Sequence, residues 1–117
     1  MSTNKVIGYL AYITKTQLIC EGDSCVIASS EAKMKSYLKQ MRPELHKKVT
    51  ITKARFADIK KGLEAGAAYS FDEESYERFR PAALQTGMNL GQGDLQEASS
   101  ISGLHLIRIQ KMTVSSN

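Results

Sequence analysis

The amino-acid sequence predicts one α+β domain, in which helices pack on one face of an antiparallel or mixed β-sheet. Two observations support this fold class. Apolar runs with strand-like alternation occur near both ends of the chain, and the segments between them carry apolar residues at helical spacing. The expected order is β-β-β-α-β-α-α-β, opening with a three-stranded meander. Because 117 residues are the length of one domain, residues 1–117 are expected to form a single domain.

Three strands are expected before residue 29. Residues 6–13 are apolar on both alternating faces, which indicates a strand covered on both sides by this chain, or on one side by a partner chain. Gly8 within this run indicates a bulge or a close backbone contact. Residues 16–20 and 25–28 are expected to form the next two strands, with the turn-forming pair Gly22-Asp23 between them.

The first helix is expected to begin after Ser29 or Ser30, which are favourable N-cap residues, and to end before Pro43. A short strand follows around Val49 and Ile51. The apolar residues of this helix occupy positions i, i+3, i+4 and i+7, and they are Met34, Tyr37, Leu38 and Met41.

Two further helices are expected in the second half of the chain. One stops at Gly66, a brief extended piece covers residues 67–71, and the other starts at Asp72, a strong N-cap. Pro81 is expected to kink or divide this last helix, which Gly87 ends. The apolar face of the second helix is formed by Phe56, Ile59 and Leu63.

The C-terminal part is expected to contain one loop and one strand. Residues 88–103 include three glycines and few large apolar side chains, which predicts a long loop. Residues 104–112 are apolar on both faces and predict a central strand, and residues 113–117 predict a frayed tail.

Basic residues are concentrated in one part of the chain. The net charge is +4, and ten lysines and arginines lie between residues 33 and 61, where only Glu44 and Asp58 oppose them. The pattern favours an electrostatic docking surface for phosphates or for an acidic protein, although a solvated helix face is an equal alternative. With the loop, the candidate partner-binding residues are Lys35, Lys39, Arg42, Lys47, Lys48, Asn89, Gln92 and Asp94.

The sequence contains no recognisable catalytic motif, so no catalytic residue, metal site or cofactor is predicted and an enzyme is the less favoured class.

Cys20 and Cys25 flank the Gly22-Asp23 turn, so we expect them on neighbouring strands. Buried reduced thiols are favoured there over a disulfide. His105 lies between two leucines and is better explained as a strand residue than as a general base.

These observations favour a small non-enzymatic regulatory protein that binds a partner protein, such as an enzyme inhibitor or modulator. The alternative is a small basic ribonuclease-type toxin or nucleic-acid-binding domain. In size, charge and terminal strand the chain is similar in class to small bacterial ribonuclease toxins, although no motif residue can be matched. A homodimer is compatible with either function. The groups considered for catalysis in the alternative are Tyr76, Arg78, His105 and Arg108.

The expected location is the cytoplasm. No run approaches the ~20 apolar residues that a membrane-spanning helix requires, and the apolar residues 6–13 are better explained as a core strand than as a signal peptide. Export by a route without an N-terminal apolar signal stays open.

Overall fold

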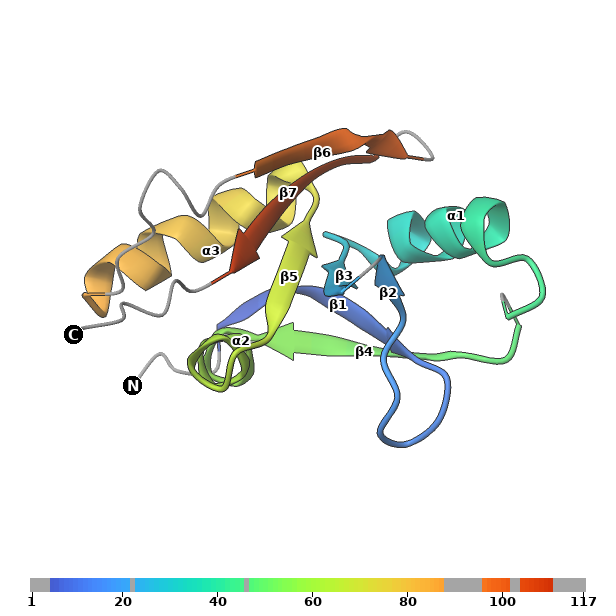
Figure 1. Ribbon diagram of the computed structural model, residues 1–117, viewed down its shortest axis with the longest axis horizontal. Helices are drawn as coiled ribbons and strands as arrows, with labels where there is room; N and C mark the ends of the chain where they lie inside the picture. Colours follow the sequence, from blue (N-terminus) through green and yellow to red (C-terminus); the bar gives the residue numbers. More distant parts are fainter. Residues whose placement is uncertain (1–4, 22, 46, 88–95, 102–103, 111–117) are drawn as a thin grey trace.

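The computed structural model describes residues 5–21, 23–45, 47–87, 96–101 and 104–110. Helices and strands alternate along much of the chain, as Figure 1 shows. In chain order the elements are β1 (Val6–Tyr12), β2 (Cys20–Glu21), β3 (Ser24–Ile27), α1 (Glu31–Met41), β4 (Thr50–Arg55), α2 (Phe56–Glu64), β5 (Ala68–Phe71), α3 (Glu73–Gln85), β6 (Gln96–Ile101) and β7 (Leu104–Gln110).

Within these ranges, the strands form two sheets. The larger is a mixed sheet in the order β2-β3-β5-β7-β6, where β3 and β5 are parallel and the other neighbours are antiparallel. β1 and β4 form an antiparallel pair. Two backbone hydrogen bonds connect this pair to β3, from Tyr9 N to Ala28 O (2.7 Å) and from Ala28 N to Tyr9 O (3.1 Å). The predicted α+β class with a mixed sheet is confirmed.

The opening meander has a shorter second strand than residues 16–20 suggested. The side chain of Thr14 accepts hydrogen bonds from the backbone N–H groups of Thr16 and Gln17, at 3.3 and 3.1 Å. These bonds hold a turn, which removes the first residues of the predicted strand. The chain returns along β1 through a bridge between Tyr12 and Leu18, and β2 then pairs with β3.

Gly8 has both roles that the sequence suggested. The β1–β4 register shifts between Val6 and Gly8, and a Cβ atom at Gly8 would lie 2.6 Å from both Ala28 O and Ile27 Cγ2. Only glycine lets the backbone of β1 approach β3 this closely.

Two apolar clusters form the core, and β3 contributes to both because successive side chains of a strand point to opposite faces. Ile27 belongs to the first cluster, which contains the inward residues of α2 and α3, whereas Val26 and Ala28 belong to the second, with those of α1. Figure 1 accordingly shows α1 apart from α2 and α3, with β3 between them. α2 and α3 pack together against the first cluster, as expected for helices on one face of the sheet. α1 packs against the second cluster.

β1 is covered by this chain on both faces. Ile7 and Leu10 lie in the first cluster and Ala11 in the second, with 0%, 7% and 1% of their surfaces exposed. Of the two coverings that the sequence left open for residues 6–13, the internal one is present. The apolar character of this strand therefore no longer calls for a partner chain.

The helix boundaries follow the predicted signals. The Ser30 side chain accepts a hydrogen bond from Lys33 N and caps α1, and Asp72 caps α3. Gly66 and Gly87 adopt positive φ angles of 100° and 79° just beyond α2 and α3. Pro81 lies inside α3, which continues through it as one helix.

The predicted loop 88–103 contains a strand. β6 pairs antiparallel with β7, from Gln96 opposite Arg108 to Ile101 opposite Leu104. A strand at the edge of a sheet gains backbone hydrogen bonds without burying both of its faces. Residues 96–101 can therefore form a strand although their polar composition predicted a loop. Residues 88–95 and 102–103 lie outside the described residues, as do the expected tail 113–117 and the last two residues of the predicted strand 104–112. β7 is central in the sheet, as predicted, because it lies between β5 and β6.

Candidate functional site

Five of the predicted partner-binding residues lie on α1 or in the turn that follows it, and Figure 1 shows α1 at one end of the fold. α1 buries Met34, Tyr37 and Leu38, so the spacing of Lys35, Lys39 and Arg42 places these three on its outer side. Two backbone hydrogen bonds shape the following turn, from Leu45 N to Arg42 O (2.9 Å) and from Lys48 N to Leu45 O (2.8 Å). We define the basic surface as Lys35, Lys39, Arg42, Lys47 and Lys48, all of which are exposed.

The cations of the basic surface are not neutralised by the described part of the chain. Ion pairs in that part join Lys33 to Glu74, Lys60 to Glu64 and Arg108 to Asp23, and none involves a residue of the basic surface. Glu31 and Glu44, the nearest acids along the chain, form no ion pair with it. The cations of the basic surface are therefore available to anionic groups that do not belong to the described residues.

Arg42 also lines a hollow of about 690 Å³ between the C-terminal end of α1 and residues 13–20. Thr16 and Gln17 contribute polar groups to it, and Cys20 and Cys25 contribute their thiols. No local sequence pattern marks this hollow, because tertiary packing brings its walls together.

An adjoining hollow of about 620 Å³ lies beside β4, and Ile13 lines both. Lys15 and Lys53 bring cations to this second hollow and Asp58 brings one carboxylate. Tyr12 and three threonines, Thr14, Thr50 and Thr52, also line it. The positive character of the basic surface thus extends toward β4.

The predicted loop contacts Asn89, Gln92 and Asp94 lie outside the described residues. The structure consequently describes the candidate surface through its helical and turn residues alone.

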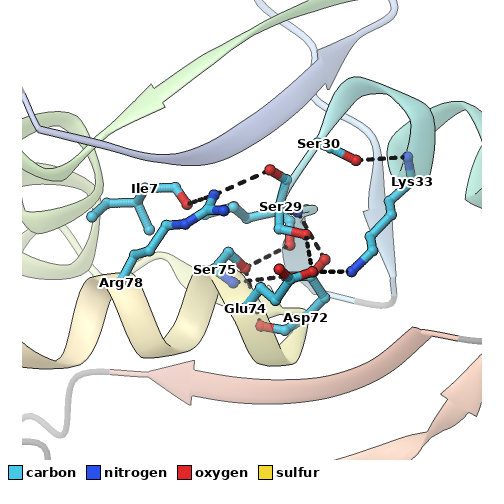
Figure 2. Close-up of polar contacts among 9 residues, drawn as sticks. Ile7, Ser29, Ser30, Lys33, Asp72, Glu74, Ser75 and Arg78 are labelled. Atoms are coloured by element: carbon cyan, nitrogen blue, oxygen red, sulfur yellow. Dashed lines mark hydrogen bonds and ion pairs between the residues drawn. The ribbon is translucent and has the colours of Figure 1, made fainter.

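The second concentration of charge is at the start of α3, and Figure 2 shows it. Asp72 is 2% exposed, and its carboxylate accepts hydrogen bonds from Ser75 N (2.9 Å) and Ser29 N (2.8 Å). Burial opposes ionisation of this carboxyl, but the hydrogen bonds from Ser75 and Ser29 outweigh it and hold its pKa below the usual 3.8. Asp72 thus caps α3 and ties it to the end of β3.

The charged side chains around Asp72 are also engaged. Lys33 forms an ion pair with Glu74, and the hydrogen bond between them raises the pKa of Lys33 and lowers that of Glu74. Arg78 donates to the backbone carbonyl oxygens of Ser29 (3.1 Å) and Ile7 (3.4 Å). We define the Asp72 cluster as Ser29, Lys33, Asp72, Glu74, Ser75 and Arg78; its polar groups connect α3, α1, β1 and the end of β3.

The residues considered for a ribonuclease are not brought together as a site by any described contact. Arg78 belongs to the Asp72 cluster, whereas Arg108 donates to both carboxylate oxygens of Asp23 at 2.8 Å. The Tyr76 ring packs edge-on against Phe71, with ring centroids 6.4 Å apart. The side chain of His105 lies outside what the structure describes.

Cys20 and Cys25 lie on neighbouring strands, as predicted. Both are unbridged thiols and half-buried, and their sulfur atoms are 3.7 Å apart. Burial is the main cause that raises the pKa of Cys25 to about 12, and the adjacent Cys20 adds to it. A thiol with so high a pKa is a poor nucleophile at neutral pH.

In the part of the chain that the structure describes, His, Cys, Asp and Glu nowhere gather in a group of three that would suit a metal ion. None of the described helices has both the length and the apolar character needed to cross a bilayer. No protein-family model matches the chain, and neither the curated proteins nor the solved structures include a significant match.

Proposed function

We propose that this chain is a non-enzymatic regulatory protein that docks through the basic surface on an acidic surface of a partner protein. The observation that carries this proposal is the contrast in pairing: the exposed cations of the basic surface have no ion-pair partner among the described residues, while neighbouring Lys33 does. Such unpaired charges increase the rate of association with an oppositely charged protein.

The edge of β4 that does not pair with β1 also supports docking on an acidic partner. Among the described residues β4 pairs with β1 alone, so its other edge is open to an added strand. Lys53 and Arg55 are exposed on it. Pairing of β4 with β4 of a second copy would bring these cations near their equivalents, whereas an acidic extended segment would be attracted. This edge therefore favours an acidic partner over a homodimer.

The experiment compares two double variants. In each, glutamate replaces two lysines, so both variants change the net charge by the same amount. Lys35→Glu/Lys39→Glu alters the basic surface, and Lys5→Glu/Lys61→Glu alters exposed lysines elsewhere. Each immobilised protein is used to capture partners from a nuclease-treated lysate, and the retained proteins are compared by mass spectrometry. We expect an acidic protein that the wild type and the Lys5/Lys61 variant retain and the Lys35/Lys39 variant loses.

A direct titration tests the alternative with labelled single-stranded RNA and labelled polyglutamate at two salt concentrations. Nucleic-acid binding would be recognised by tight, steeply salt-dependent binding of RNA that the Lys35/Lys39 variant loses. That result, or identical capture by all three proteins, would contradict docking on an acidic protein.

A further inference from the structure

Cys20 and Cys25 occupy directly opposed positions in the β2–β3 hairpin. The neighbouring pair, Ile19 and Val26, is joined by a backbone hydrogen bond of 3.4 Å from Val26 N to Ile19 O. Because hydrogen-bonded and non-hydrogen-bonded pairs alternate along an antiparallel ladder, the two cysteines form a non-hydrogen-bonded pair. In such pairs the Cα atoms are about 4.5 Å apart and the side chains are closest. This spacing lies within the range that a disulfide requires, about 4.4–6.8 Å between Cα atoms.

The side chains also point toward one another and are open to small molecules. The two sulfur atoms are 3.7 Å apart, and both residues line the 690 Å³ hollow beside Arg42. Away from the hollow, Cys25 packs against the first apolar cluster, and its neighbour in the parallel β3–β5 ladder is Tyr69. A small reagent can therefore reach the pair through the hollow.

We propose that Cys20 and Cys25 are a redox-active dithiol, which a low-molecular-weight disulfide oxidises to an intramolecular disulfide. In the first step the Cys20 thiolate attacks one sulfur of the reagent, and the other sulfur leaves as a thiolate. In the second, the Cys25 thiolate attacks the Cys20 sulfur, and the second reagent sulfur leaves. The two cysteines lose two electrons to the reagent, and their two protons end on the released thiols.

The order of the steps follows from the surroundings of the two thiols. Burial keeps Cys25 protonated at neutral pH, so the first attack belongs to Cys20. Burial, the largest cause that raises the pKa of Cys25, remains in the mixed disulfide, and only the smaller contribution of the Cys20 charge is removed. The hairpin register then holds the Cys25 sulfur beside the atom that it attacks.

This inference depends on the β2–β3 hairpin, the hollow beside it and the burial of Cys25, and it does not depend on the proposed docking function. Its test equilibrates the purified chain with mixtures of oxidised and reduced glutathione, quenches with acid and measures intact mass. We expect the folded chain to lose two hydrogens without retaining glutathione or forming a covalent dimer. The equilibrium constant should be at least about tenfold larger in the folded chain than in the urea-unfolded chain, because the fold holds the sulfurs together.

Two variants locate the roles of the thiols. Cys25→Ser should accumulate a glutathione adduct at Cys20, and Cys20→Ser should form an adduct at Cys25 much more slowly. The proposal is overturned if the folded wild type yields mainly adducts or covalent dimers, or if its equilibrium constant does not exceed that of the unfolded chain. The wild-type comparison decides the matter alone if circular dichroism shows that a variant has not folded.

Discussion

The Asp72 cluster and the basic surface both concentrate charge, but they use it differently. In the cluster, the Asp72 carboxylate and the Arg78 guanidinium bond to backbone groups of other elements, and Lys33 is paired with Glu74. In the basic surface, no described partner neutralises the cations. Because a buried charge is costly unless hydrogen bonds compensate it, the first arrangement serves stability. The exposed, unpaired charges of the second contribute little to stability and are available for binding.

The largest loss of stability is expected where the Asp72 cluster meets β1. A Cβ atom added by Gly8→Ala would lie 2.6 Å from Ala28 O and 3.2 Å from Ser75 Cβ, and the backbone oxygen cannot move without breaking the β1–β3 contact. We expect the free energy of unfolding, measured in urea, to fall by about 3 kcal/mol. The control Gly66→Ala meets nothing within 4 Å and should lose only about 1 kcal/mol from its positive φ. Equal losses would contradict the close contact.

Removing the carboxylate of Asp72 should cause the next largest loss of stability. Asp72→Ala leaves the N–H groups of Ser29 and Ser75 without their acceptor, and we expect a loss of about 2–3 kcal/mol in urea unfolding. Asp72→Asn keeps one acceptor oxygen and should lose about half as much. Glu73→Ala, in the same turn but exposed, should lose about 0.5 kcal/mol through the helix dipole. A similar cost at Glu73 and Asp72 would show that the cluster does not depend on this buried carboxylate.

The same carboxylate should make stability depend on pH. Its pKa is lower in the folded chain than the usual 3.8, so its contribution is fully present above that value and is lost as the pH falls through the lower folded pKa. Urea unfolding from pH 6 to about pH 2.5 should show a decline that is shallower in Asp72→Asn. Parallel curves for the two proteins would rule out Asp72 as a source of acid sensitivity.

The smallest effect on stability is expected at the basic surface. Lys35→Gln/Lys39→Gln removes two exposed cations that pair with no described residue, so the free energy of unfolding should change by less than about 0.5 kcal/mol. Partner capture by this variant should nevertheless weaken. A loss of stability comparable to that of Asp72→Ala would mean that the surface has a structural role and would end the contrast between the two regions.

Much of the fold could be predicted because its signals are local. Ser30 and Asp72 cap helices as their side-chain chemistry requires, and Gly66 ends α2 because it tolerates a positive φ. The exposure of Lys35 and Lys39 followed from the apolar spacing of α1. The candidate site was predicted only in part, since the hollow beside Arg42 is built from segments distant in sequence.

Other features were not predicted because the apolar pattern of the sequence does not record their causes. The polar segment 96–101 becomes β6 through backbone pairing with β7, and two-residue β2 is short because the Thr14 side chain holds the preceding turn. Pro81 fits inside α3, although proline cannot donate a helical hydrogen bond. For β6 and β2, hydrogen bonds that the apolar pattern does not record decided the outcome.

Local signals in the sequence were enough to predict the α+β class, most helix boundaries, the position of the two cysteines across a turn and the exposure of the α1 lysines. Spacing, caps and turn residues act over a few neighbouring positions, so no long-range contact was needed. Which lysine of α1 forms an ion pair depends instead on tertiary packing. Lys33 and Lys35 differ by half a turn of one helix, yet the fold places Glu74 beside the first alone, since α3 reaches α1 from only one side.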